Sequence, residues 1–240
     1  MKLAIATPFY NSQAFVQYVE SLLLSTRVLD KLGVEWDYWT IHNDSYIDRA
    51  KNSIADRFYK SDCTDLLMID SDMSWDAQGF LLLLKSPFEL TGGVYPMKGA
   101  WDKYAHRIKF NEKNAPIQDA ETGLIEADAL PGGFLRIQKS CIDKMTKAYQ
   151  NNWYYQDGAA PEKAEKIVNL FEMSTIENVK YGEDGGFCRK WTQMGGKCYV
   201  EPRITFGHTG SKTYEGNFHE YLLRSAEGER LRVAIEGIIK

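Results

Sequence analysis

The stretch Leu66-Leu67-Met68-Ile69-Asp70-Ser71-Asp72 places four apolar residues directly before two carboxylates. A short, continuous apolar run is typical of a strand that is buried on both faces. Because ligands bind beyond the carboxyl ends of such strands, this one would deliver Asp70 and Asp72 to the binding edge of a sheet. Two hard oxygen donors suit Mg²⁺ or Mn²⁺, whose remaining positions are open to water and to diphosphate oxygens. Taken alone, the motif also allows a plainer interpretation, in which one aspartate caps the helix predicted from Asp76 and the other is solvated.

The sequence around this stretch alternates predicted strands and helices. Strands are predicted at Leu3–Thr7, where Pro8 would end the strand, at Trp36–Ile41 and at Leu66–Ile69, and helices between them at Ile47–Tyr59 and after them at Asp76–Leu84. Strands separated by helices pair in parallel through right-handed crossovers. The predicted fold class is therefore α/β, with a Rossmann-like open and mostly parallel sheet flanked by helices.

Another helix is predicted between the first two strands. Its apolar residues recur at helical spacing, at Phe15, Val19, Leu22, Leu23 and Leu29. Asn11 or Ser12 is the predicted N-cap, and Gly33 is the predicted end of the helix. We therefore expect the named apolar side chains to pack against the sheet.

The second half of the chain is less regular. Strands are predicted at Leu90–Tyr95, at Ala127–Leu130 and Phe134–Ile137 on either side of a Pro131-Gly132-Gly133 turn, and at Tyr199–Val200, with helices at Lys139–Gln150, Phe187–Met194 and Phe218–Ile239. No repeat or linker interrupts the chain, so a single domain over residues 1–240 is predicted.

The composition excludes several classes of protein. Hydrophobic residues make up 44% of the 240 residues, which is enough for a substantial core, and the net charge of −4 does not indicate a nucleic-acid partner. The four cysteines form no CxxC pair, which excludes a zinc ribbon and fits a reducing compartment. No apolar run approaches the ~20 residues of a membrane helix. A cytoplasmic protein without a membrane span is predicted.

Several short motifs, in their order along the chain, resemble those of GT-A glycosyltransferases. The resemblance is greatest to family-2-like enzymes, including those of viruses and phages, and covers most of the chain. It rests on Leu3 to Asn11, Asp48-Arg49-Ala50-Lys51-Asn52, the DxD motif Asp70-Ser71-Asp72, Gly92-Gly93-Val94-Tyr95, Gly132-Gly133-Phe134-Leu135, Gly182-Glu183-Asp184 with Phe187-Cys188-Arg189, and Gly207-His208. It implies a donor-binding half over residues 1–100, an acceptor-binding and catalytic half over residues 101–240 and, for a virus- or phage-encoded enzyme, the host cytoplasm.

The resemblance implies a metal site and two nucleotide-sugar contacts within the DxD motif. Asp72 would ligate Mn²⁺ or Mg²⁺ directly, and Asp70 would act through the metal, a water or the donor ribose, beside Ser71. His208 would be a third ligand whose nitrogen favours Mn²⁺. The alternative for His208 is an ordinary histidine in a polar loop.

The resemblance also implies a catalytic base that removes the proton of the acceptor hydroxyl. Asp184 is the candidate, and Glu183 is a possible substitute. Two glycines follow Asp184 where bulkier residues are common in the family, and an aspartate there is also a good first-turn residue of a helix. Both roles are compatible, because a helix start would hold the carboxylate in place and ionised.

Donor contacts are expected along the first half and in one late loop. Thr7, Pro8 and Tyr10 would lie near the nucleotide base, and Asp44 near the base or ribose. Arg49 could reach a phosphate, Asn52 would lie near the donor, and Lys212 belongs to a loop that would close over the diphosphate. Asp44 is equally a turn residue, and an exposed helix charge is the commoner role of a residue such as Arg49. These residues predict binding of a nucleotide diphosphate sugar of UDP or GDP type.

The predicted function is transfer of a hexosyl or pentosyl group from this donor to a hydroxyl of a glycan or other acceptor, with inversion. One alternative is a nucleotidyltransferase, although its glycine-rich loop is absent after the first strand, which runs into Pro8-Phe9-Tyr10-Asn11. Another is a catalytically silent module that binds nucleotide sugars or glycans. A calcium-binding EF-hand is excluded, because Trp75 and Leu81 replace its glycine and its bidentate glutamate.

Overall fold

The computed structural model describes residues 1–99, 103–156, 164–210 and 212–226. Its helices are α1 (Val16–Lys31), α2 (Ile47–Lys60), α3 (Ala77–Leu84), α4 (Lys139–Ala148) and α5 (Glu183–Gln193), and residues 218–226 are also helical. The predicted terminal helix is thus present at its start, and its remainder lies outside the described residues. Within the described residues no helix is long and apolar enough to cross a membrane.

A central sheet of eight strands forms the middle of the molecule, in the order β2-β1-β3-β8-β5-β13-β7-β6. The strands are β1 (Lys2–Phe9), β2 (Glu35–His42), β3 (Asp65–Ile69), β5 (Leu90–Gly92), β6 (Arg107–Ile108), β7 (Ile125–Ala129), β8 (Phe134–Gln138) and β13 (Cys198–Val200). Only β8 and β7 run against the others, so six of the eight strands share one direction. The predicted α/β architecture with a mostly parallel sheet is confirmed.

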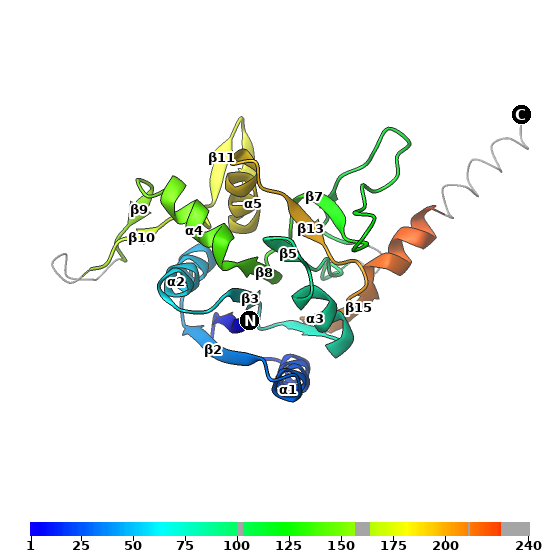
Figure 1. Cartoon of the computed structure of the whole chain (residues 1–240), viewed down its shortest axis with the longest axis horizontal. Coiled ribbons are helices and arrows are strands. Elements are labelled where there is room, and N and C mark those ends of the chain that lie inside the picture. The colour runs from blue at the N-terminus through cyan, green and yellow to red at the C-terminus, as the bar shows by residue number, and fades with distance from the viewer. Residues whose placement is uncertain (100–102, 157–163, 211, 227–240) are drawn as a thin grey trace, which may run out of the picture.

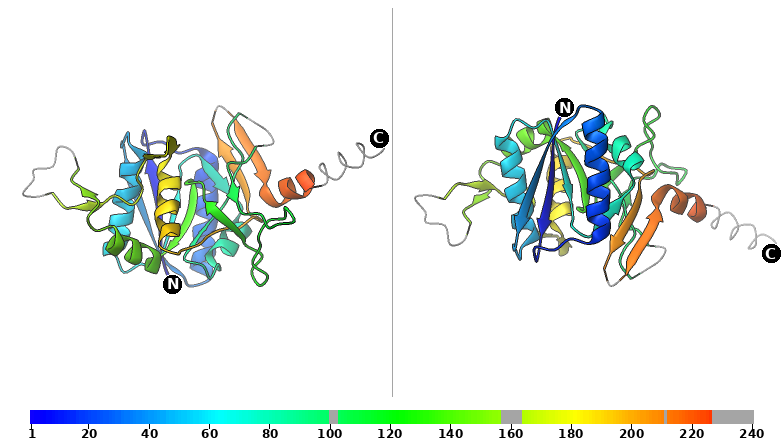
Figure 2. Two further views of the ribbon diagram at one scale, coloured as in Figure 1. Left: turned by 90° about the horizontal axis from the view of Figure 1, so that it is seen from above. Right: turned by 90° about the horizontal axis from the view of Figure 1, so that it is seen from below.

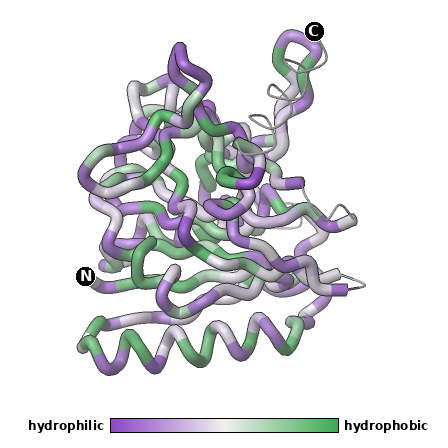
Figure 3. The backbone as a smooth tube through the Cα atoms, turned by 90° about the vertical axis from the view of Figure 1, so that its right-hand side faces the viewer, coloured by the Kyte–Doolittle hydropathy of each residue, from purple (hydrophilic) through white to green (hydrophobic). Residues whose placement is uncertain are grey.

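Helices cover both faces of this sheet, with α2, α4 and α5 on one side and α1 and α3 on the other (Figures 1 and 2). Successive residues of β3 alternate between the two cores: Leu66 and Met68 join the core under α2, α4 and α5, while Leu67 and Ile69 join the core under α1 and α3. In Figure 3 hydrophobic residues accordingly run through the centre of the molecule. The buried apolar run of β3 is explained by burial on both faces.

The first strand extends one residue beyond Pro8, which the sequence interpretation placed after its end. Pro8 pairs in register with Ile41 of β2, whereas the pairing of β1 with β3 stops at Ala6 opposite Met68. At Pro8 the strand therefore has a partner on one side only, and the missing N–H group breaks no ladder. The strand end that carries the candidate site is thus partly open.

The face of α1 that packs on the sheet agrees with the prediction only in part. Leu29 is buried and Leu22 packs against the same core, whereas Phe15, Val19 and Leu23 are exposed. The buried residues of the helix also include Ser21 and Ser25. Both serines accept hydrogen bonds from Trp75, Ser21 from its backbone N–H at 3.0 Å and Ser25 from its indole at 2.8 Å. Polar contacts, as well as apolar periodicity, determine which side of the helix faces inward.

The predicted cap of α1 is also wrong, whereas its predicted end is correct. The helix begins after Phe15 with no side-chain cap, and the Ser12 hydroxyl instead donates to the side chain of Asn43. Gly33 follows the helix with φ +65°, a left-handed conformation that glycine adopts without steric cost.

A second, three-stranded sheet was not predicted. It consists of β4 (Met73–Trp75), β14 (Thr205–Thr209) and β15 (Thr213–Asn217), in the order β15-β14-β4. Because β4 follows the DxD motif directly and pairs His208 with Met73, this sheet holds a late segment of the chain beside the motif. The remaining strands form two hairpins, β9 (Trp153–Tyr154) with β10 (Ile167–Val168), and β11 (Ser174–Ile176) with β12 (Val179–Tyr181).

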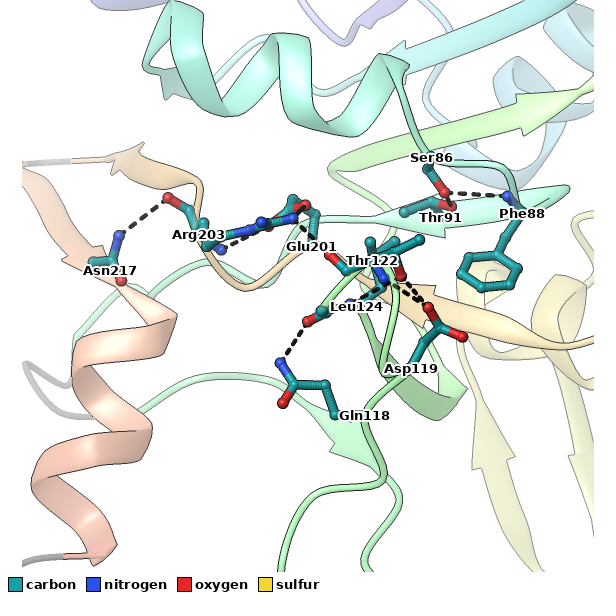
Figure 4. A network of polar contacts seen from close by, with 11 residues as sticks. Ser86, Phe88, Thr91, Gln118, Asp119, Thr122, Leu124, Glu201, Arg203 and Asn217 are labelled. Carbon is teal, nitrogen blue, oxygen red and sulfur yellow. Dashed lines mark hydrogen bonds and ion pairs between the residues drawn. The ribbon is translucent and has the colours of Figure 1, made fainter.

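A polar network anchors the connection between β13 and β14 (Figure 4). The buried carboxylate of Glu201 accepts two hydrogen bonds of 2.6 Å from the Arg203 guanidinium. That guanidinium also donates to the carbonyl of Thr122, and Asn217 donates to the carbonyl of Arg203. The network ties this connection to a surface turn and to β15, and so supports the sheet that contains His208.

Candidate active site

A cavity of about 280 Å³ opens at the carboxyl ends of β1, β2 and β3. Six of the predicted site residues line this β1–β3 cavity: Pro8, Tyr10, Asp44, Asp70, Ser71 and Asp72. Apolar side chains including Phe9, Ile41 and Met173 complete the wall. A lining that combines carboxylates with aromatic and aliphatic groups suits a ligand with a charged part and a flat part.

Asp44 is held at the rim of this cavity by Arg49 of α2. The guanidinium Nε lies 3.0 Å and 2.8 Å from the two carboxylate oxygens, and the backbone N–H of Tyr46 donates to the same group. Burial raises the pKa of Asp44, but the hydrogen bonds from Arg49 and Tyr46 outweigh it and hold the pKa below its usual value. Arg49 is therefore engaged with Asp44, and the ionised Asp44 is presented to the cavity.

Asp72 lies beside His208, as the sequence interpretation expected. The His208 ring donates from Nδ1 to the carbonyl of Pro96 at 2.9 Å, because a carbonyl oxygen only accepts. In the neutral ring Nε2 then carries a lone pair, and it faces Oδ2 of Asp72 at 3.6 Å. The ammonium of Lys98 lies 2.5 Å from the same oxygen.

These side chains suit a divalent cation. A carboxylate oxygen and an imidazole lone pair that face each other require positive charge nearby, and here Lys98 supplies it. Neighbouring ligands of a small octahedral cation lie roughly 3 Å apart, close to the observed separation. The backbone hydrogen bond on Nδ1 is the usual support for a metal-binding histidine. The described residues contain no group of three His, Cys, Asp or Glu side chains arranged to hold a metal, so the remaining ligands would come from solvent or substrate.

Asp70 is turned toward Lys51 rather than toward His208. Its Oδ1 is buried, has no hydrogen-bond partner and lies 3.7 Å from the Lys51 ammonium. Burial raises the pKa of Asp70 despite this cation. Oδ1 is thus desolvated and incompletely satisfied, whereas the side chain as a whole is 31% exposed and lines the β1–β3 cavity.

Lys51 forms the bridge between the two halves of the site. Its side chain is 1% exposed, and its ammonium lies 2.9 Å from Glu183 and 3.1 Å from the carbonyl of Gly132. Burial lowers the pKa of Lys51, but the surrounding carboxylates, Asp70 first, raise it well above its usual value. A side chain on Gly132 would collide with this ammonium, which explains the glycine.

Asp184 lies at the start of α5 and also packs against Gly132. One of its carboxylate oxygens accepts from the N–H of Gly132 at 3.0 Å and the other from the N–H of Gly185 at 2.6 Å. Asp184 faces a second cavity of about 260 Å³, which we call the α5 cavity. It is lined by Tyr104, Ala105, His106, Arg107, Ala129, Leu130, Pro131, Gly182, Asp184 and Gly185.

Four predicted donor contacts line neither cavity: Thr7, Arg49, Asn52 and Lys212. Thr7 is fully buried, and its hydroxyl is 2.5 Å from that of Tyr18. Asn52 is buried as well. Its side-chain amide donates to the carbonyl of Phe171 through Nδ2 and accepts from the N–H of Phe171 through Oδ1. Lys212 lies over the ring of Tyr214, at 4.9 Å from its centroid. Thr7 and Asn52 are thus buried residues that support the walls of the site and do not face the cavities.

Three residues near the carboxylates were not recognised from the sequence: Lys51, Lys98 and Tyr95. Lys51 belongs to a motif that was recognised, but nothing in a charged helix start indicates that the lysine is buried. The hydroxyl of Tyr95 accepts from the N–H of Gly133 at 2.9 Å, and its ring packs edge-on against His208. A recognisable signal for Tyr95 was its place in the Gly92-Gly93-Val94-Tyr95 segment.

The Glu183 carboxylate allows a test of this network by pH. Burial raises the pKa of Glu183, but Lys51 and two backbone N–H groups together lower it by more than burial raises it. The net shift of the pKa is therefore downward from 4.5. A lowered pKa contributes stability above the unfolded value, and that contribution is lost as pH falls through the folded value. In urea unfolding, we expect Glu183→Gln to be about 1–3 kcal/mol less stable than the parent at pH 7. The deficit should shrink below about pH 4.5, and a deficit that stays constant down to pH 3 would contradict the assignment.

No family model and no curated protein matches the chain. Among solved structures, the protein A197 from STIV is 14% identical, with 88% of this chain and 86% of that chain covered and a TM-score of 0.51. GalNAc-T7, solved with UDP, GalNAc and Mn²⁺, is 12% identical over 85% of this chain and 43% of its own, with a TM-score of 0.49. A Drosophila β1,4-galactosyltransferase 7 mutant with manganese, UDP-Gal and xylobiose is 14% identical over 92% and 73%, at a TM-score of 0.43. With its mostly parallel sheet and flanking helices, the chain has the GT-A type of α/β fold that the sequence predicted.

Proposed function

We propose that this chain is a metal-dependent glycosyltransferase that moves a sugar from a nucleotide diphosphate to an acceptor hydroxyl. The observation that carries the proposal is the chain of contacts that links two cavities. One cavity presents Asp44, Asp70 and Asp72, and the other presents Asp184. Asp70 lies 3.7 Å from the Lys51 ammonium, which bonds to the carbonyl of Gly132, and the N–H of Gly132 donates to Asp184, so donor and acceptor would meet beside these residues.

The β1–β3 cavity would bind the donor. Its aromatic and aliphatic wall suits a nucleotide base, and Asp44, kept ionised by Arg49, would accept hydrogen bonds from base or ribose. Asp72 and His208 would hold Mn²⁺ or Mg²⁺ once Lys98 moves away. When bound, the cation would neutralise the negative charge that develops on the departing diphosphate.

Asp184 would act as the catalytic base. Two backbone N–H groups orient its carboxylate at the edge of the α5 cavity, where an acceptor hydroxyl can approach it. Removal of the hydroxyl proton makes the oxygen nucleophilic as it attacks the anomeric carbon. Attack from the side opposite the diphosphate would invert the configuration at that carbon.

The test is to supply UDP-, GDP-, CMP- and dTDP-sugars with Mn²⁺ and to quantify the nucleotide products by ion-pair chromatography. A glycosyltransferase releases nucleoside diphosphate (or CMP from a CMP-sugar), including slow release with water as the acceptor. A nucleotidyltransferase instead consumes added pyrophosphate and forms nucleoside triphosphate. Donor binding without any turnover would identify a silent module, and either of the last two results would overturn the proposal.

A further inference from the structure

The α5 cavity is lined by the positive charge of Arg107 and by the negative charge of Asp184, whose carboxylate oxygens accept hydrogen bonds from two backbone N–H groups. Arg107 lines the cavity and lies over the ring of Tyr181, with the guanidinium carbon 5.7 Å from the ring centroid. Arg189 of α5 lies over the same ring at 5.4 Å. Among the described residues neither guanidinium has an ion-pair or hydrogen-bond partner, and Nε of Arg189 is buried without one. Two guanidiniums thus lie over one tyrosine, each without a paired carboxylate.

Two N–H groups at the start of α5 are already engaged within the helix start. That of Gly185 donates to the Asp184 carboxylate, and that of Gly186 donates to the carbonyl of Gly182. The negative charge of Glu183 is in turn paired with Lys51 at 2.9 Å. Attraction for an anion in the cavity would therefore come from the arginines and not from the helix terminus.

His106, next to Arg107 in the chain, contributes one more unsatisfied polar atom. His106 lines the cavity, and its Nδ1 is buried without a hydrogen-bond partner. Its ring packs against Phe218 and Tyr221, at centroid separations of 5.3 Å and 6.3 Å. The ring is thereby held in one orientation, and a hydrogen bond to a ligand oxygen in the cavity would satisfy Nδ1.

We propose that the α5 cavity binds an anionic group of the acceptor, a carboxylate or a phosphate, with Arg107 as its main ligand. Arg189 adds a second positive charge at Tyr181, and His106 adds a hydrogen bond. A guanidinium matches both anions through paired N–H donors. The identification of the bound molecule as the acceptor rests on the proposed function. The acceptor would then be an acidic molecule whose reacting hydroxyl lies near Asp184.

The test uses probes that share one sugar ring and differ only at carbon 6: glucose, glucuronate and glucose 6-phosphate, together with inorganic phosphate. Binding to the ¹⁵N-labelled full chain is followed by NMR, including the arginine Nε–H signals. We expect at least one anionic probe to bind about 10-fold more tightly than glucose, as one additional charge-assisted contact provides. A preference for glucuronate identifies a carboxylate acceptor, and a preference for the phosphates identifies a phosphorylated one.

Arg107→Gln should remove this preference while leaving the weak binding of glucose unchanged. Arg57→Gln is the matched control, because Arg57 also lies over an aromatic ring, that of Trp39, but on the outer side of α2. The proposal is overturned if neither phosphate nor glucuronate perturbs the Arg107 signal in a saturable way, or if Arg107→Gln retains the parent's preference. No donor or turnover enters this measurement, so its failure is distinct from failure of the nucleotide-release test.

Discussion

Replacement of Lys51 by methionine is expected to lower the free energy of unfolding by about 3–5 kcal/mol, the usual cost of leaving a buried charge without its partner. Methionine fills a similar volume but removes the cation that Asp70 and Glu183 share. The loss should be greatest near neutral pH, where both carboxylates are ionised. As pH falls and they take up protons, the deficit should become smaller. Urea unfolding between pH 4 and pH 8 measures both effects.

Lys144→Met is the control for this substitution. Lys144 also pairs with a glutamate, Glu89 at 2.8 Å, but its side chain is 57% exposed. Exposed ion pairs contribute about 0–1 kcal/mol, so little change is expected. If Lys51→Met loses no more than Lys144→Met, the ammonium does not hold the two halves of the site together.

Replacement of Asp184 by asparagine is expected to lower kcat for sugar transfer by about 10²–10⁴-fold, the range typical of a lost general base. The amide keeps the shape of the carboxylate but cannot take the proton of the acceptor. Donor binding should be unchanged, because Asp184 does not line the β1–β3 cavity. Steady-state release of nucleoside diphosphate gives kcat, and the thermal shift caused by the donor reports binding.

Asp143→Asn, on the exposed side of α4, controls for the loss of one negative charge elsewhere. It should retain parental turnover. An Asp184→Asn variant that folds, binds donor and retains more than about a tenth of the parental kcat would exclude Asp184 as the base. Glu183 would then be the next candidate.

The part of the fold nearest the site was predictable because its signals are local. A buried strand needs apolar residues throughout, and Leu66 to Ile69 are such a run. The carboxyl ends of neighbouring parallel strands share one edge, which is why Pro8, Asp44 and Asp70 were expected together and line one cavity. Chain order and strand direction were sufficient for that inference.

The remainder depends on contacts between distant segments. The inward face of α1 is determined by Ser21 and Ser25, which bond to a tryptophan 54 and 50 residues away. The strand with His208 pairs with β4, more than 130 residues earlier, and local sequence contains no trace of that partner. Lys51 is buried only because two carboxylates from other elements surround it. Burial of a charge is therefore a property of the assembled site.

If Asp72 and His208 hold a cation at the donor diphosphate, a thermal-shift panel of nucleotide sugars with and without Mn²⁺ should reveal it. A donor at about 100 times its Kd stabilises the folded state by about 2.7 kcal/mol. In the parent, one donor should raise the Tm, and most of that rise should require Mn²⁺. Asp72→Ala should lose the part that depends on Mn²⁺. The account is contradicted if Asp72→Ala shows the same Mn²⁺-dependent rise as the parent.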